Sequence, residues 1–192
     1  IGLEEGDLVC GPHDPLTRRG ARALQQSGES PTRLHNNCSG KHAGMLALAR
    51  TAGWPTLGYE TPCHPVQQGA LAQVARWSGV PAARIAQMGD GCGVVAFATP
   101  LRAMALAFAR LGAASHRGDD VAQRIVHAMT SRPFLVGGTD RFLDGEQRVA
   151  DFPVPALTRY GAAAAVVAGI AAVAQFDDFP AGVAQGADRL SL

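Results

Sequence analysis

The sequence predicts a helix-rich fold of the α/β (α+β) class, and three observations support this. Apolar residues recur at helical spacing in several stretches. Proline and glycine stand at the ends of these stretches, where helices begin and end. One short run rich in valine follows a loop with three glycines, as a strand would. The 192 residues suffice to bury a core without disulfide support.

The helices are expected in the following order. A short one covers residues 19–26, and a longer one begins near residue 40, after capping residue types, and stops at Gly53. The next begins at Pro65 and closes at Gly79, and a further one runs from residue 100 to 111, before Gly112. Another covers about 120–131, and the alanine-rich residues 161–174 favour a buried helix. Between them, residues 84–98 predict a turn, a glycine loop at 89–93 and a short strand at 94–98.

Composition excludes several classes of function. The chain has 17 basic and 16 acidic residues, a formal net charge of +1, and no basic run, which argues against nucleic-acid binding and against a membrane-surface role. No segment approaches the roughly 18 apolar residues of a membrane span. The four cysteines form no C-x-x-C pair, so we expect free, mostly buried thiols and a cytoplasmic location. The first residues lack the basic flank of a signal peptide. Because the chain begins with Ile1 and not with Met, we expect a fragment or a processed product of a longer protein.

Residues 35–44 form the densest group of chemically active side chains. They include two imidazoles, two carboxamides, a thiol, a hydroxyl and Lys41, the only lysine among the 17 basic residues. Cys38 immediately precedes the predicted helix, whose N-terminal dipole should lower the pKa of its thiol from about 8.5. Lys41 lies three residues further on, so thiol and amine can face one cavity.

A shared zinc site is one interpretation of these residues. Zinc accepts thiolate ligands, and Cys92 in the glycine loop could supply a second sulfur. Asp90, two residues earlier, could then hydrogen-bond the ligating amine.

Other interpretations stay open at this point. Cysteines with this spacing are more often separate buried thiols than metal ligands, and a histidine such as His42 is more often a packed imidazole than a general base. Two nucleophilic pairs can also be written, Cys38 with His42 and Ser39 with Lys41, although the second pair diverges at a helix start.

The motifs of this sequence closely resemble those of one protein family. Residues 33–46 read RLHNNCSGKHAGML, which closely resembles the L-asparaginase II family, the rhizobial-type, zinc-carrying asparaginases. Shorter motifs follow the family's order over about residues 3–142: GDLVCGPH at 6–13, GWP at 53–55, HPVQ at 64–67, GDGCG at 89–93, PLRAMA at 100–105 and PFLVGG at 133–138.

The resemblance implies site residues and a fold. By it, Cys38, Lys41 and Cys92 are zinc ligands, with water as the fourth. Asp90 orients the lysine and lines the substrate site, to which Asn37, Ser39 and His42 also belong. The fold is similar to that of serine β-lactamases and glutaminases, a sheet flanked by helices. Residues 1–142 would form the zinc-site segment, and residues 143–192 a divergent, alanine-rich segment that packs on the same domain.

The resemblance also implies an activity. The family hydrolyses L-asparagine, a small-molecule substrate, to L-aspartate and ammonia through a nucleophilic serine paired with lysine, and a homodimer of the full-length enzyme is compatible with it. With a single lysine, this sequence holds no Ser-x-x-Lys motif. We therefore expect the chain to be the zinc and substrate-site section of an L-asparaginase. The alternative is a catalytically inactive, truncated remnant that binds zinc or asparagine.

Overall fold

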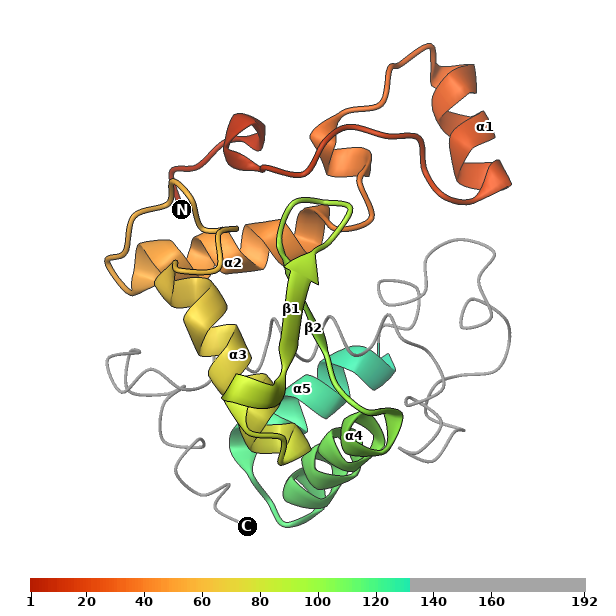
Figure 1. Ribbon diagram of the computed structural model, residues 1–192. Helices are drawn as coiled ribbons and strands as arrows, with labels where there is room; N and C mark the ends of the chain where they lie inside the picture. Colours follow the sequence, from red (N-terminus) through yellow and green to blue (C-terminus); the bar gives the residue numbers. More distant parts are fainter. Residues whose placement is uncertain (132–192) are drawn as a thin grey trace.

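The computed structural model describes residues 1–131, and Figure 1 shows their arrangement. The α-helices are α1 (Arg18–Ser27), α2 (Ser39–Thr51), α3 (Pro65–Ser78), α4 (Leu101–His116) and α5 (Asp120–Ser131). Short 3-10 turns are η1 (Glu5–Asp7), η2 (Arg33–His35) and η3 (Ala82–Arg84). Strands β1 (Ala86–Gly89) and β2 (Val95–Ala98) pair antiparallel, with Gly89 opposite Val95. These elements confirm the helix-rich α/β class.

Local signals set the ends of several helices, as the sequence predicts. The imidazole of His64 accepts a hydrogen bond from the Val66 amide at 3.2 Å, and Pro65 occupies the first turn of α3. Gly79 ends α3 at a φ of 74°, a backbone conformation that glycine adopts without steric cost. The Asp119 carboxylate caps α5 by accepting from the Ala122 amide at 2.8 Å.

Helix α4 is longer than predicted. Gly112 does not end it; this residue is buried within the helix, which continues to His116. Its buried place in the packing outweighs the cost of about 1 kcal/mol that a glycine adds inside a helix. The left-handed glycine of this region is Gly118, with a φ of 89°.

Strand β1 is absent from the sequence prediction. All four of its residues are exposed, so neither face of the strand is buried in the core. The strand exists because its backbone pairs with β2, a tertiary interaction that local pattern does not encode.

Two apolar clusters hold the described residues together. The helical cluster joins α3, α4 and α5 through Trp77, Phe108, Leu111, Ala114, Val121, Ala122, Ile125 and Met129. The site cluster joins the N-terminal segment, α2, the start of α3 and the β1–β2 loop through Leu8, Cys10, Met45, Leu46, Leu48, Ala49, Tyr59, Val66, Ala70, Cys92 and Val94. In Figure 1 the loop between β1 and β2 lies at the N-terminal end of α2.

Two further sequence predictions concern other parts of the chain. The predicted helix at 161–174 and the division at residue 142 lie outside the described residues. Among the helices of residues 1–131, none has both the length and the apolar character needed to cross a membrane.

Candidate metal centre

Cys38 is placed by the residues that precede α2. It is the N-cap residue of that helix, and its amide donates to the Asn36 side-chain oxygen at 2.8 Å. The other end of the Asn36 amide donates to the Gly11 carbonyl at 2.7 Å. Because Asn36 is 6% exposed and bonded at both ends, it fixes the backbone of Cys38 against the N-terminal segment.

The β1–β2 loop presents Asp90 and Cys92. The Asp90 amide donates to the Val94 carbonyl at 2.8 Å, and the Gly93 amide donates to the Asp90 carbonyl at 2.9 Å. Gly93 has a φ of 95°, which a side chain would strain. One carboxylate oxygen of Asp90 accepts from the Gly91 amide at 2.7 Å, so the other oxygen is left for contacts outside the loop backbone.

Four side chains converge between α2 and this loop. The Cys38 sulfur, an Asp90 carboxylate oxygen and the Cys92 sulfur all lie within 4.8 Å of one another. Lys41 Nζ lies 2.9 Å from Asp90 Oδ2, and the Cys92 thiol donates to the same oxygen at 3.3 Å. The structure thus brings together Cys38, Lys41, Asp90 and Cys92, which are 54 residues apart at most.

This donor set fits zinc. In a tetrahedral site with zinc–sulfur bonds of about 2.3 Å, two sulfurs lie about 3.8 Å apart. The sulfurs of Cys38 and Cys92 lie no more than 4.8 Å apart, which is compatible with both of them binding one ion. Two thiols with an amine or a carboxylate are donors that zinc accepts.

Lys41 and Asp90 each stabilise the charged form of the other. Burial of the Lys41 ammonium lowers its pKa, but the hydrogen bond to Asp90 and the neighbouring cysteines raise the pKa more, and the net shift is upward. The hydrogen bond from Lys41 holds the pKa of Asp90 below its ordinary value. In the metal-free protein the pair is an ammonium and a carboxylate.

The thiol of Cys38 differs from the sequence prediction. Burial raises its pKa to about 11, and the nearby thiol of Cys92 adds to this, whereas Lys41 lowers it only in part. The expected lowering by the helix N-terminus is therefore wrong for the metal-free protein, because desolvation of the thiolate dominates.

The remaining predicted site residues have other partners. Asn37 is exposed, and its side-chain oxygen lies 3.1 Å from Nε2 of His13. The Ser39 hydroxyl donates to the Leu34 carbonyl at 3.1 Å, whereas Lys41 binds Asp90, so the Ser39–Lys41 pair does not form. His42 is fully buried, and burial lowers its pKa.

His42 pairs with a tyrosine and not with Cys38. Its Nδ1 lies 2.5 Å from the hydroxyl of Tyr59. This is the packed imidazole that the sequence left as an alternative.

All four cysteines are free thiols, as the sequence predicts. Cys10 and Cys92 are buried, Cys38 is half-buried and Cys63 is exposed. Cys10 lies in the site cluster with Cys92.

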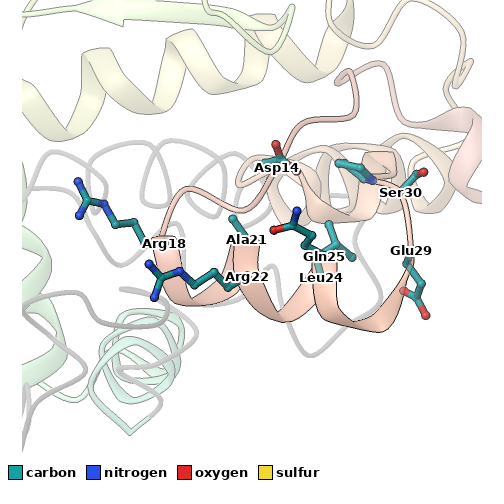
Figure 2. Close-up of a pocket in the computed structure, with 9 residues that line it drawn as sticks. Asp14, Arg18, Ala21, Arg22, Leu24, Gln25, Glu29 and Ser30 are labelled. Carbon is teal, nitrogen blue, oxygen red and sulfur yellow. The ribbon is translucent and has the colours of Figure 1, made fainter.

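A separate surface hollow of about 560 Å³ lies beside α1 (Figure 2). Arg18 and Arg22 project from one side of the helix, and Asp14 and Glu29 also line the hollow. None of its lining residues belongs to the predicted site, so this hollow takes no part in the metal centre.

The fold and the site together define a helix-rich α/β protein with a thiol, amine and carboxylate centre. A family model described as L-asparaginase II matches residues 1–183, and the chain belongs to the L-asparaginase II family. The match extends past residue 142, where the resemblance of the motifs ends. The family is one of asparaginase-type amidohydrolases, whose substrates are small molecules. A search of curated proteins found no match.

Proposed function

We propose that this chain carries the zinc and substrate-site section of an L-asparaginase, which hydrolyses L-asparagine to L-aspartate and ammonia. The observation that supports it is the convergence of Cys38, Cys92, Asp90 and Lys41 in a chain of the L-asparaginase II family.

Three residues would hold the zinc ion. Cys38 and Cys92 would bind as thiolates and Lys41 as a neutral amine, with water as the fourth ligand. When bound, zinc supplies a positive centre with one open position for a polar group of the substrate. Asp90 would keep its hydrogen bond to the Lys41 amine, which fixes the direction of the amine lone pair.

Asp90 is also suited to the substrate itself. Its side chain is 42% exposed, against 15% for Lys41, so a small ligand can reach it. Its depressed pKa keeps the carboxylate ionised at neutral pH. A carboxylate beside the metal centre would attract the α-ammonium group of an amino-acid substrate.

The nucleophile is not among these residues. Amide hydrolysis through an acyl-enzyme needs an activated hydroxyl and a base. Lys41, the only lysine in the sequence, binds Asp90, and Ser39 binds the Leu34 carbonyl. We therefore expect little or no turnover by the 192 residues alone, and turnover when a Ser–Lys nucleophile is supplied.

A second candidate follows from the same observation. A chain without its own Ser–Lys pair would act as a catalytically inactive protein that binds zinc or asparagine. Both candidates share the metal centre and differ in the release of ammonia.

The experiment measures zinc content, L-asparagine binding and ammonia release for the chain and three variants. Cys38→Ala and Lys41→Arg should lose zinc, because Arg cannot give up its proton. Cys63→Ser, at an exposed cysteine outside the cluster, is the control and should keep it.

Each result separates the candidates. Ammonia release that is lost in Cys38→Ala and Lys41→Arg but kept in Cys63→Ser excludes the inactive candidate. Zinc-dependent L-asparagine binding without ammonia release, even when a Ser–Lys nucleophile is supplied, supports it. A chain that binds neither zinc nor L-asparagine contradicts both.

A further inference from the structure

A buried polar pair lies in the core beside the metal centre. Tyr59 is 1% exposed and His42 is 0% exposed. Their rings meet edge to face, with centroids 5.6 Å apart and an interplanar angle of 87°. The Tyr59 hydroxyl lies 2.5 Å from Nδ1 of His42, so one short hydrogen bond joins the two side chains.

A third partner occupies one acceptor position of the Tyr59 hydroxyl. The Val9 amide donates to the Tyr59 hydroxyl oxygen at 2.9 Å. The hydroxyl hydrogen is then free to be donated to Nδ1 of His42, and in that arrangement the imidazole hydrogen lies on Nε2. The Tyr59 carbonyl also accepts from the Gln67 side chain at 2.9 Å. Tyr59 thereby connects the N-terminal segment, α2 and α3.

The backbone of His42 belongs to the first turn of α2. The His42 amide donates to the Cys38 carbonyl at 3.0 Å, which closes this turn. Residues four apart lie on one face of a helix, so His42 is one turn below Cys38, and Lys41 is its immediate neighbour. Fixing the imidazole therefore fixes the direction in which Cys38 and Lys41 leave the helix.

The His42–Tyr59 pair costs folding stability compared with two apolar side chains. Nε2 of His42 is buried and has no hydrogen-bond partner among residues 1–131. An unsatisfied buried donor costs about 1–3 kcal/mol, and two apolar side chains of similar size would avoid that cost. What an apolar pair could not supply is a directional contact between the Val9 segment and the first turn of α2.

We propose that Tyr59 is a positioning residue of the metal centre, acting through His42 to hold Cys38 and Lys41 toward the β1–β2 loop. This inference rests on the proposed zinc function.

The test compares metal binding by the wild-type chain and by Tyr59→Phe, which removes only the hydroxyl. We expect the zinc Kd of the variant to rise about tenfold, the lower end of the range for residues that orient metal ligands. With cobalt in place of zinc, we expect weaker tetrahedral and sulfur-to-cobalt absorption bands. Ile125→Val, in the helical cluster, is the control, because it also costs a modest amount of stability.

A second pair of variants tests the same hydrogen bond from the other side. His42→Asn keeps an acceptor near the Nδ1 position, whereas His42→Leu removes it. We expect His42→Asn to retain more zinc affinity and more of the cobalt spectrum than His42→Leu. These two His42 variants test the positioning role if Tyr59→Phe does not fold.

The outcomes distinguish the inference from the function on which it rests. A tenfold loss in Tyr59→Phe, with wild-type affinity in Ile125→Val, supports the positioning role. Wild-type zinc affinity and cobalt spectrum in Tyr59→Phe, or equal affinities in His42→Asn and His42→Leu, overturn it while the zinc function stands. A wild-type chain that binds neither metal overturns the zinc function, and the positioning role falls with it.

Discussion

The number of protons that zinc displaces tests which side chains bind the metal. At pH 6 the Cys38 thiol is protonated, since its pKa is about 11, and the Cys92 thiol donates a hydrogen bond to Asp90. Lys41 is an ammonium, with its pKa raised by the hydrogen bond to Asp90. Asp90 is already ionised, since its pKa is lowered. Binding by Cys38, Cys92 and Lys41 therefore releases three protons, and binding by the two cysteines and Asp90 releases two.

The magnitude follows from the ordinary pKa of lysine. Deprotonating a lysine of pKa 10.4 at pH 6 costs about 6 kcal/mol, and the upward shift of the Lys41 pKa adds to this cost. Apparent zinc affinities of about 10–16 kcal/mol exceed this cost. Each displaced proton makes the zinc affinity rise about tenfold per pH unit, so three protons predict about a thousandfold rise per unit.

Calorimetric titration in buffers of different ionisation enthalpy counts these protons. At pH 6 zinc-bound water, with a pKa near 7, stays largely protonated and adds little to the count. We expect three protons for the wild-type chain and for Asp90→Asn, and no zinc binding by Lys41→Arg. A count of two in the wild-type chain, or stoichiometric zinc in Lys41→Arg, would refute Lys41 as a ligand.

Three further predictions concern the residues around the centre. Asn36→Ala removes the hydrogen bonds to the Cys38 amide and the Gly11 carbonyl and should cost about 1–3 kcal/mol in urea unfolding; an unchanged midpoint would contradict this role. Because burial lowers the pKa of His42, its contribution to stability is complete above pH 6.5 and is lost as the pH falls through the lowered value. Thermal unfolding of the metal-free chain should therefore show a loss between pH 7 and 5 that is smaller in His42→Asn, and equal losses would exclude His42 as the cause. Gly93→Ala should cost about 1–3 kcal/mol and weaken zinc binding, because a φ of 95° strains a side chain. Gly44→Ala, within α2 and with open space for its Cβ, should instead gain stability, and equal effects in urea unfolding would contradict the argument.

The fold was predictable where local signals are strong. Pro65 and Gly79 bound α3 in the sequence as they do in the structure. Gly112 misled because a glycine can end a helix or lie buried inside one, and only the packing of α4 decides between them. Strand β1 could not be predicted, because its stability comes from pairing with β2.

The site was predictable in its chemistry and less so in its supporting contacts. Cys38 and Lys41 are close in sequence, so the helical turn already suggests that they face one space. Asn36 and Tyr59 were missed, because their partners Gly11 and Val9 lie 25 and 50 residues away. The raised pKa of Cys38 was missed for a related reason: burial is a property of the folded chain.

X-ray absorption at the zinc edge shows directly whether Cys38 and Cys92 share one zinc ion. We expect one zinc per chain, with two sulfur neighbours at about 2.3 Å and two lighter neighbours at about 2.0–2.1 Å. We also expect Cys92→Ser to lose one sulfur neighbour or the metal altogether. A zinc shell without sulfur, or the same two sulfurs in Cys92→Ser, would contradict zinc binding by both cysteines.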